Sequence, residues 1–223
     1  MIPCCPSRQI LLGPATLLAL FYFLVPVLLP AGCDGGTRQR VLCKYVIDGD
    51  TIILSDGRRV RYQGINAPEI PHDGQPGEPF GLRAKEVNRR LVQGKFIDIE
   101  ISRNQPLDRY NRVIAHVFLR NGKHVGEMLV RAGLAMACTY GKQDRYSKRL
   151  LAAQRSAISR KAGIWGLPPD RPEDYYIGNS RSLRFHRPWC KNGRQTSMKN
   201  RVIFKSRLKA FKEGYCPCRA CRP

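Results

Sequence analysis

Acidic residues are scarce in this sequence. Its 223 residues contain 17 Asp and Glu against 39 Lys and Arg, which gives a formal net charge of +22 at pH 7. This imbalance excludes a charge-neutral surface. A field of that sign and size attracts polyanions, either nucleic acid or an anionic membrane surface. A basic surface that only keeps the protein soluble is the simpler interpretation of the same composition.

The C-terminal stretch, residues 176–223, contains few acidic residues and few apolar residues. Glu213 is its single acidic residue against 13 Lys and Arg, a net charge of +12. A fold held by a hydrophobic core alone is excluded because the apolar residues are too few. A metal ion or a disulfide that staples the segment is therefore expected. A Pro-rich segment, residues 168–175, precedes this stretch and predicts a linker. We therefore expect a small α+β module after a larger domain at residues 38–167.

The N-terminus is nearly free of charge. Residues 10–29 form an apolar run that is followed by the sequence PAGC, ending at Cys33. This pattern predicts a secretory signal or membrane anchor over residues 1–33, with a lipid on Cys33 as one outcome. Pro30 stands where lipoprotein signals carry a leucine, and an uncleaved membrane span is the alternative. Each outcome places the rest of the chain outside the cytoplasm, in the periplasm or cell envelope or secreted.

Between residues 38 and 167, short β patterns alternate with amphipathic helical patterns. The expected strands cover residues 41–47, 51–54, 58–65, 95–102 and 112–119, with a further strand-like stretch at 134–140. The expected helices cover residues 79–92, 125–132 and 146–162. Five strands with three helices predict an α+β fold built on a five-stranded OB-type β-barrel.

Two polar turns flank the predicted strand at residues 58–65. The first carries Asp48 and Asp50, and the second carries Asn66 and Ala67. Calcium binds carboxylate, carbonyl and water oxygens. Asp50 supplies a carboxylate, Asp48 a second ligand or a support for it, and Asn66 and the Ala67 carbonyl supply neutral oxygens. The two turns therefore predict a calcium site, although Asn66 offers an amide where a carboxylate is more usual.

Three further residues near these turns suit phosphodiester hydrolysis. Glu69, three residues after Asn66, is placed to position or deprotonate a water molecule. Arginine binds two phosphate oxygens at once and stabilises the negative charge of a phosphorane. Arg61, on the strand between the turns, and Arg112, at the start of a later strand, are the candidates. Each signal alone is more often a turn or a solvated side chain.

Five motifs fall in a fixed order along the chain: IDGDT at 47–51, RVRYQGINAPE at 59–69, LDRYNR at 107–112, LVRAGLA at 129–135 and GIW at 163–165. Over roughly residues 40–166 the chain resembles thermonucleases of the staphylococcal nuclease type. The resemblance implies an OB-fold, calcium-dependent nuclease that hydrolyses DNA and RNA and leaves 3′-phosphates.

The resemblance also implies roles for individual residues. By position, the catalytic residues would be Arg61, Glu69 and Arg112, and the calcium ligands would include Asp50 and the Ala67 carbonyl. Tyr110 and Tyr140 lie near positions where the family places tyrosines around the nucleotide. Asn66 stands where the staphylococcal enzyme has an aspartate ligand. The loss of one formal charge predicts weaker calcium binding with the catalytic residues retained.

Cysteines cluster at the C-terminus. His186 and Cys190 form an H-x3-C pair, and Cys218 and Cys221 form a C-x2-C pair. Four nitrogen and sulfur ligands in two short-spaced pairs predict a tetrahedral zinc site whose metal supplies folding energy. One alternative is two disulfides among these three cysteines and Cys216, in an oxidising compartment, and another is a free redox pair. Cys43 and Cys138, in apolar strand-like surroundings, are expected to be buried without a bridge.

The same segment resembles a second family. FHRPWC and the later NRVIFKSRLKAFKEGYCPCRACRP are similar to the zinc-binding domain at the N-terminus of the Ada DNA-repair methyltransferase. The first ligand of that family is a cysteine that accepts methyl groups, whereas His186 stands here. Imidazole binds zinc but cannot be the acceptor thiolate, so methyl repair is not implied. Cys216 is a further thiol that could replace His186 as the fourth ligand.

Together these features predict an exported nuclease, expected to be a monomer, with calcium at the catalytic site and structural zinc at the C-terminus. Its partners would be DNA or RNA and, through the N-terminal segment or a lipid on Cys33, a membrane. The alternative is a nucleic-acid-binding protein of the cell envelope with weak or no catalysis.

Overall fold

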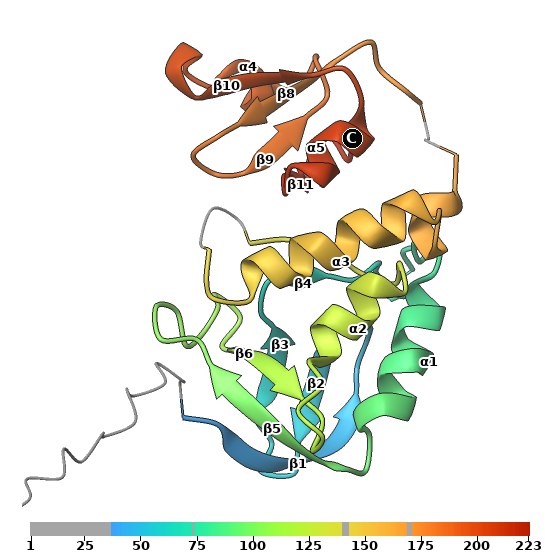
Figure 1. Cartoon of the computed structure of the whole chain (residues 1–223), viewed down its shortest axis with the longest axis vertical. Helices are drawn as coiled ribbons and strands as arrows, with labels where there is room; N and C mark the ends of the chain where they lie inside the picture. The colour runs from blue at the N-terminus through green and yellow to red at the C-terminus, as the bar shows by residue number, and fades with distance from the viewer. Residues whose placement is uncertain (1–36, 73, 140–142, 169–170) are drawn as a thin grey trace, which may run out of the picture. The chain divides into compact units, whose positions relative to one another are not determined.

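Five strands close into a barrel in the order β1-β2-β3-β6-β5 (Figure 1). They are β1 (Gln39–Val46), β2 (Thr51–Leu54), β3 (Arg59–Tyr62), β5 (Phe96–Ile101) and β6 (Val113–Phe118). Neighbouring strands are antiparallel except β3 and β6, which run parallel. The computed structural model describes residues 37–72, 74–139, 143–168 and 171–223. It confirms the predicted five-stranded barrel within an α+β fold.

Strand β1 shows why these residues close a barrel. Val41 and Cys43 point into the core, whereas Lys44 and Tyr45 are exposed. The register with β2 shifts between Cys43 and Tyr45, which marks a β-bulge. Bulges bend and twist a strand, as closure of a small barrel requires. The bend leads the chain into the turn that carries the candidate acidic residues.

The prediction of one strand over residues 58–65 is wrong. Strand β3 ends at Tyr62, and a turn with Gly64 at φ +76° separates it from β4 (Ile65–Asn66). β4 pairs with β7 (Met136–Ala137) outside the barrel, so the predicted strand at 134–140 is also reduced to two residues. The left-handed backbone favours glycine at position 64, and a Cβ there would also lie 2.8 Å from a Leu150 methyl group, which would have to shift. The turn redirects the chain toward Asn66.

The three expected helices are present with shorter ends. They are α1 (Gly81–Val92), α2 (Val125–Arg131) and α3 (Ser147–Ser159), followed by the 3₁₀ helix η1 (Gly163–Gly166). Helix α1 supports the barrel through a buried amide, Asn88. Its side chain accepts a hydrogen bond from the Tyr62 hydroxyl at 2.9 Å and donates one to the Asp48 carbonyl at 3.1 Å. The first acidic turn is therefore held from behind by α1.

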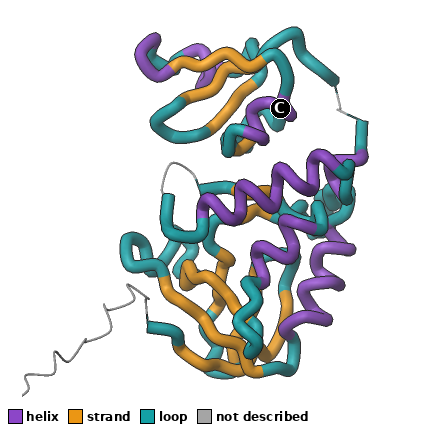
Figure 2. The backbone as a smooth tube through the Cα atoms, in the orientation of Figure 1, coloured by secondary structure: helices purple, strands orange, loops and turns teal. Residues whose placement is uncertain are grey.

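Residues 176–223, here called the C-terminal module, form a four-stranded sheet in the order β10-β8-β9-β11 (Figure 2). Its strands are β8 (Tyr176–Asn179), β9 (Arg184–His186), β10 (Arg201–Phe204) and β11 (Cys216–Pro217). Its helices are α4 (Lys191–Arg194), the 3₁₀ helix η2 (Met198–Asn200) and α5 (Arg207–Lys212). The expected α+β composition is confirmed.

The module shares a hydrophobic core with the end of the larger domain. The buried members are Ala157, Ile158 and Trp165 from the larger domain with Tyr176, Phe185, Phe204, Ala210, Phe211 and Tyr215 from the module. Gln154 on α3 is fully buried; its amide donates to the Phe211 carbonyl at 2.6 Å and accepts from the Ala137 N–H at 2.8 Å. Helix α3 thus supplies apolar surface that the module lacks.

A disulfide joins Cys138 to Cys216, with their Cα atoms 5.4 Å apart. The expectation that Cys138 is buried without a bridge is therefore wrong, whereas Cys43 is buried and free as expected. The pairing removes Cys216 from the C-terminal cluster, which excludes both the two-disulfide alternative and Cys216 as a fourth ligand. The bridge crosses 78 positions, so local sequence gave no signal for it.

The predicted signal or anchor at residues 1–33, including Cys33, lies outside the described residues. Within the ranges that are described, no helix has both the length and the apolar character of a bilayer span.

Candidate active site

Asp50 is the buried centre of the first acidic turn. It is 5% exposed, and its carboxylate accepts a hydrogen bond from the Ala67 N–H at 2.6 Å and pairs with Arg61 at 3.0 Å. Burial raises the pKa of Asp50 from 3.8 to about 7, although Arg61 acts in the opposite direction. A nearby cation stabilises the charged form of a carboxylate. The side chain is therefore in a position where a bound cation would relieve the cost of burial.

The two polar turns approach each other because Gly49 has no side chain. A Cβ at this position would lie 2.5 Å from the Ala67 Cβ and 2.8 Å from the Ala84 Cβ. Asp48 closes the same turn, since its carboxylate accepts the Asp50 N–H at 2.8 Å. The sequence Asp48-Gly49-Asp50 thus serves close packing of the turns as well as ligand chemistry.

Arg61 reaches from β3 into this site and is firmly held. Its guanidinium donates to the carbonyls of Tyr62 and Ile65, both at 3.0 Å, and to the Asn66 side-chain oxygen at 2.9 Å. Asn66 in turn directs its amide at the Ala67 carbonyl, at 3.4 Å. The Asn66 oxygen that was predicted as a calcium ligand therefore contacts Arg61, and the predicted Ala67 carbonyl lies beside the Asn66 amide.

Glu69 lies on the exposed side of the same site. Its backbone N–H donates to the Glu78 carboxylate at 3.0 Å, and its carbonyl accepts the Glu78 N–H at 2.8 Å. These bonds close the loop between residues 69 and 78 and fix the backbone of Glu69. Gly81 allows the approach, since a Cβ there would lie 2.3 Å from the Glu69 carbonyl oxygen. The carboxylate is left facing solvent, where a water molecule can reach it.

Arg112 is positioned by the turn that precedes β6. Its guanidinium pairs with Asp108 at 2.7 Å, and its N–H donates to the same carboxylate at 3.0 Å. Burial opposes the charge of Asp108, but the hydrogen bonds from Arg112 lower its pKa. Tyr110, 57% exposed, lies with its ring 5.4 Å from the Arg112 guanidinium. Tyr140, the other predicted nucleotide contact, lies outside the described residues.

The predicted catalytic residues line one cavity of about 590 Å³. Its wall includes Asp48, Asp50, Arg61, Asn66, Glu69, Tyr110 and Arg112. The cavity therefore combines oxygen ligands, a solvent-facing carboxylate and two arginines. This set can bind a cation beside a phosphate group and remove a proton from a water molecule.

Comparison with known proteins points to the same chemistry. Residues 59–166 match the family described as staphylococcal nuclease homologue. A thermonuclease of Staphylococcus hyicus is 34% identical over 139 residues, covering 60% of this chain and 80% of the relative. The chain belongs to the staphylococcal nuclease family. An uncharacterized endonuclease of Escherichia coli is 33% identical, covering 66% of this chain and 86% of the relative. Endonuclease YncB of Bacillus subtilis is 32% identical, covering 60% of this chain and 67% of the relative. The chain is therefore a nuclease.

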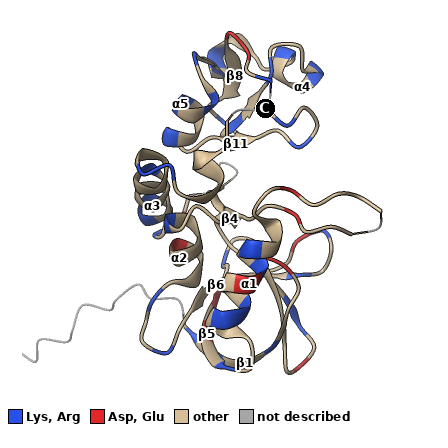
Figure 3. Ribbon diagram, turned by 90° about the vertical axis from the view of Figure 1, so that its right-hand side faces the viewer, with Lys and Arg blue, Asp and Glu red and all other residues tan. Residues whose placement is uncertain are grey.

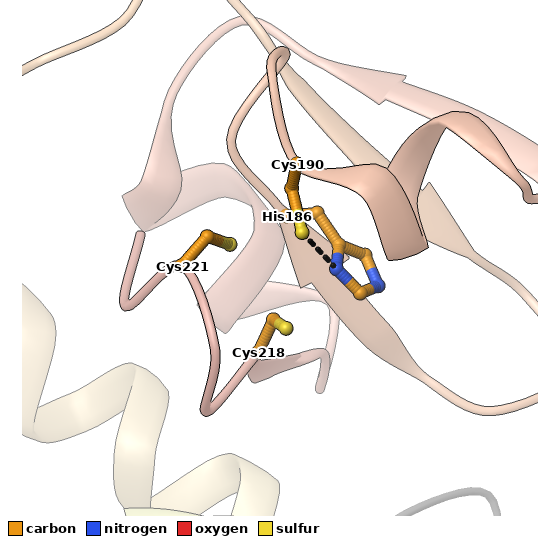
Figure 4. Close-up of side chains that lie close together, drawn as sticks. All are labelled: His186, Cys190, Cys218 and Cys221. Carbon is orange, nitrogen blue, oxygen red and sulfur yellow. Dashed lines mark hydrogen bonds between the residues drawn. The ribbon is translucent and has the colours of Figure 1, made fainter.

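Outside the part matched to the nuclease family, four side chains of the C-terminal module converge (Figure 4). The ligand atoms of His186, Cys190, Cys218 and Cys221 all lie within 4.8 Å of one another, and all four residues are buried. A tetrahedral zinc ion separates its ligand atoms by about 4 Å. Burial lowers the pKa of His186, with Arg184 acting in the same direction, so its imidazole is in the neutral form that binds metals. The cluster fits a closed metal site.

Three arginines of the C-terminal module line the catalytic cavity and were missed as individual site residues. They are Arg207, Arg219 and Arg222. The net charge of +12 indicated a role in binding a polyanion, and Figure 3 shows Lys and Arg recurring along the module. Composition could not indicate which of the 13 basic residues reach the nuclease site, because that depends on how the module packs on α3.

Proposed function

We propose that this nuclease is an exported, calcium-dependent endonuclease that hydrolyses DNA and RNA to products with 3′-phosphates. The observation that carries the proposal is the joint lining of one cavity by Glu69, Arg61, Arg112 and the acidic turn. Calcium dependence and product chemistry follow the resemblance to thermonucleases. The predicted leader at residues 1–33 supports export.

Glu69 accepts the proton of the attacking water, because its carboxylate faces solvent on a backbone that Glu78 fixes. Water attacks phosphorus in line with the 5′-oxygen, the P–O5′ bond breaks, and the phosphate stays on the 3′ side. Arg61 and Arg112 bind the non-bridging and leaving oxygens as negative charge increases. Arg112 uses Nε and Nη2 for Asp108, which leaves Nη1 for the substrate.

Asp50, with Asp48, the Ala67 carbonyl and Asn66, would hold the calcium ion. The fit rests on the oxygen donors and on the burial that raises the pKa of Asp50 to about 7. When bound, calcium would acidify water and neutralise phosphate charge. Asn66 contributes no formal charge and contacts Arg61, so we expect weaker calcium binding than an aspartate would give.

In the C-terminal module, His186, Cys190, Cys218 and Cys221 would hold structural zinc. The module would bind the polyanion through its basic surface, as its resemblance to the Ada zinc-binding domain suggests. His186 cannot accept a methyl group, so the module is proposed to bind nucleic acid without repairing it.

A nucleic-acid-binding protein with weak catalysis is the second candidate, favoured by Asn66 at the metal site. One assay separates the two: the purified protein is incubated with single-stranded DNA in calcium and in a chelator. We expect cleavage only in calcium, with 3′-phosphate ends on the products. Binding without cleavage over a full calcium titration would support the second candidate.

A further inference from the structure

Arg219 links two neighbouring cavities. A second cavity of about 330 Å³ adjoins the catalytic one, and both are lined by Arg61, Tyr110, Arg112, Cys138 and Arg219. Among the described residues, Arg219 is the one member of the C-terminal module that lines both. A groove therefore runs from the acidic turn past the two catalytic arginines, with the module forming part of its wall.

The turn that carries Arg219 is fixed on both sides. The backbone N–H groups of Ala220 and Cys221 point at the Cys218 sulfur, and the Arg222 N–H donates to the Cys218 carbonyl at 2.9 Å. Two residues before Cys218, the Cys138–Cys216 disulfide ties this strand to a residue that itself lines both cavities. The position of Arg219 beside the groove is therefore set by covalent and hydrogen bonds.

Arg219 has no charged partner in the part of the chain that the structure describes. Its side chain is exposed, and no described carboxylate forms an ion pair or hydrogen bond with it. The neighbouring acids have other partners: Asp108 pairs with Arg112, and Asp144 with His116. The backbone of this turn is held, and the exposed guanidinium beside Arg61 and Arg112 is available to an anionic partner from outside the chain.

We propose that Arg219 forms a phosphate-binding subsite that extends the catalytic groove along the nucleic-acid backbone, beyond the phosphate that is cleaved. The inference rests on the proposed hydrolysis at this cavity. The C-terminal module is thus a wall of the nuclease groove, and the substrate contacts both parts of the chain at once. Because phosphate contacts carry no base information, the subsite strengthens binding to all sequences equally.

The test measures binding separately from cleavage. The purified protein and its Arg219→Ala, Arg219→Lys and Arg181→Ala variants are titrated with a labelled single-stranded oligonucleotide in a chelator over a series of salt concentrations. Arg181 is the matched control, because it is an exposed arginine of the same module that lines neither cavity. Each lost phosphate contact reduces the slope of log K against log salt by about 0.7 for a single strand.

We expect Arg219→Ala to weaken binding about tenfold, as loss of a charged hydrogen bond does, and to lower the salt slope by about 0.7. Arg219→Lys should keep the salt slope, and Arg181→Ala should weaken binding and lower the slope by less than Arg219→Ala does. In calcium, Arg219→Ala should raise KM about tenfold and change kcat less than about twofold, since the catalytic residues are intact. Equal binding by the two alanine variants, or faster cleavage by Arg219→Ala, would overturn the subsite. A wild-type protein that binds but never cleaves would instead overturn the proposed hydrolysis and leave the binding result standing.

Discussion

Replacing Asp50 with asparagine should stabilise the metal-free protein at neutral pH while removing the calcium site. Burial raises the pKa of Asp50 from 3.8 to about 7 in the folded state. Between these two values the folded protein holds a proton that the unfolded chain has lost. The contribution of Asp50 to the unfolding free energy is therefore most favourable below pH 3.8 and is lost as the pH rises to 7.

The size of this effect follows from the shift. About three pKa units at about 1.4 kcal/mol each correspond to a loss of about 4 kcal/mol of unfolding free energy above pH 7. Asparagine imitates the protonated carboxyl group, so Asp50→Asn avoids this loss. The variant and the wild type should have equal stability near pH 4 and should differ by about 4 kcal/mol near pH 8.

Urea unfolding in a chelator, at several pH values from 4 to 8.5, measures the difference. Asp56→Asn is the control, because hydrogen bonds from Arg58 lower the pKa of Asp56 and its replacement should not stabilise. Calcium should then raise the unfolding free energy of the wild type and leave Asp50→Asn unchanged. If Asp50→Asn were no more stable than the wild type at pH 8, the inference that burial disfavours this charge would be refuted.

Four further changes test the catalytic site, the C-terminal module and the disulfide that joins them. Glu69→Gln should lower kcat about 10²- to 10⁴-fold in saturating calcium, because the proton acceptor is lost. An unchanged turnover number would show that another group takes the proton. Glu86→Gln is the control, because this carboxylate on α1 lines neither cavity and should leave kcat unchanged. Asn66→Asp should lower the calcium concentration for half-maximal activity about tenfold, since ligand charge helps set affinity. An unaltered calcium titration would place this side chain outside the coordination shell. Elemental analysis should find about one zinc ion per chain in the wild type. The double change Cys218→Ser and Cys221→Ser should abolish this zinc, whereas Cys43→Ser, at a buried free thiol elsewhere, should retain it. Replacing Cys138 and Cys216 together with serine should lower the unfolding free energy by about 4 kcal/mol, as the entropy of a 78-position loop predicts; equal stability in urea would contradict a formed bridge.

The barrel was predictable because its signals are local. Alternation of apolar residues depends on neighbours in sequence, and it located β1, β2, β5 and β6 within one or two residues. The strand predicted at 58–65 failed at Gly64, where the chain leaves the barrel to pair with β7. That choice depends on Met136 and Ala137, about 70 positions away, which a local pattern cannot reveal.

The candidate site was predictable as a set of residues but not as a set of contacts. Asp48, Asp50, Glu69, Arg61 and Arg112 were recognised from motifs, and they do line one cavity. The motifs gave no indication that the Asn66 oxygen contacts Arg61 at 2.9 Å or that Asp108 holds Arg112. Such bonds depend on side-chain directions that are fixed only after the turns pack together.

The sequence by itself determined the nuclease family, the oxygen-rich turns, the two catalytic arginines and the Cys/His cluster, because each is encoded in short motifs with fixed spacing. Only the tertiary structure decided that Cys138 pairs with Cys216, that α3 completes the core of the C-terminal module and that Arg219 lines the catalytic groove. These contacts join residues about 50 or more positions apart. They arise from burial of shared apolar surface, which depends on three-dimensional complementarity and leaves no periodic trace in the chain.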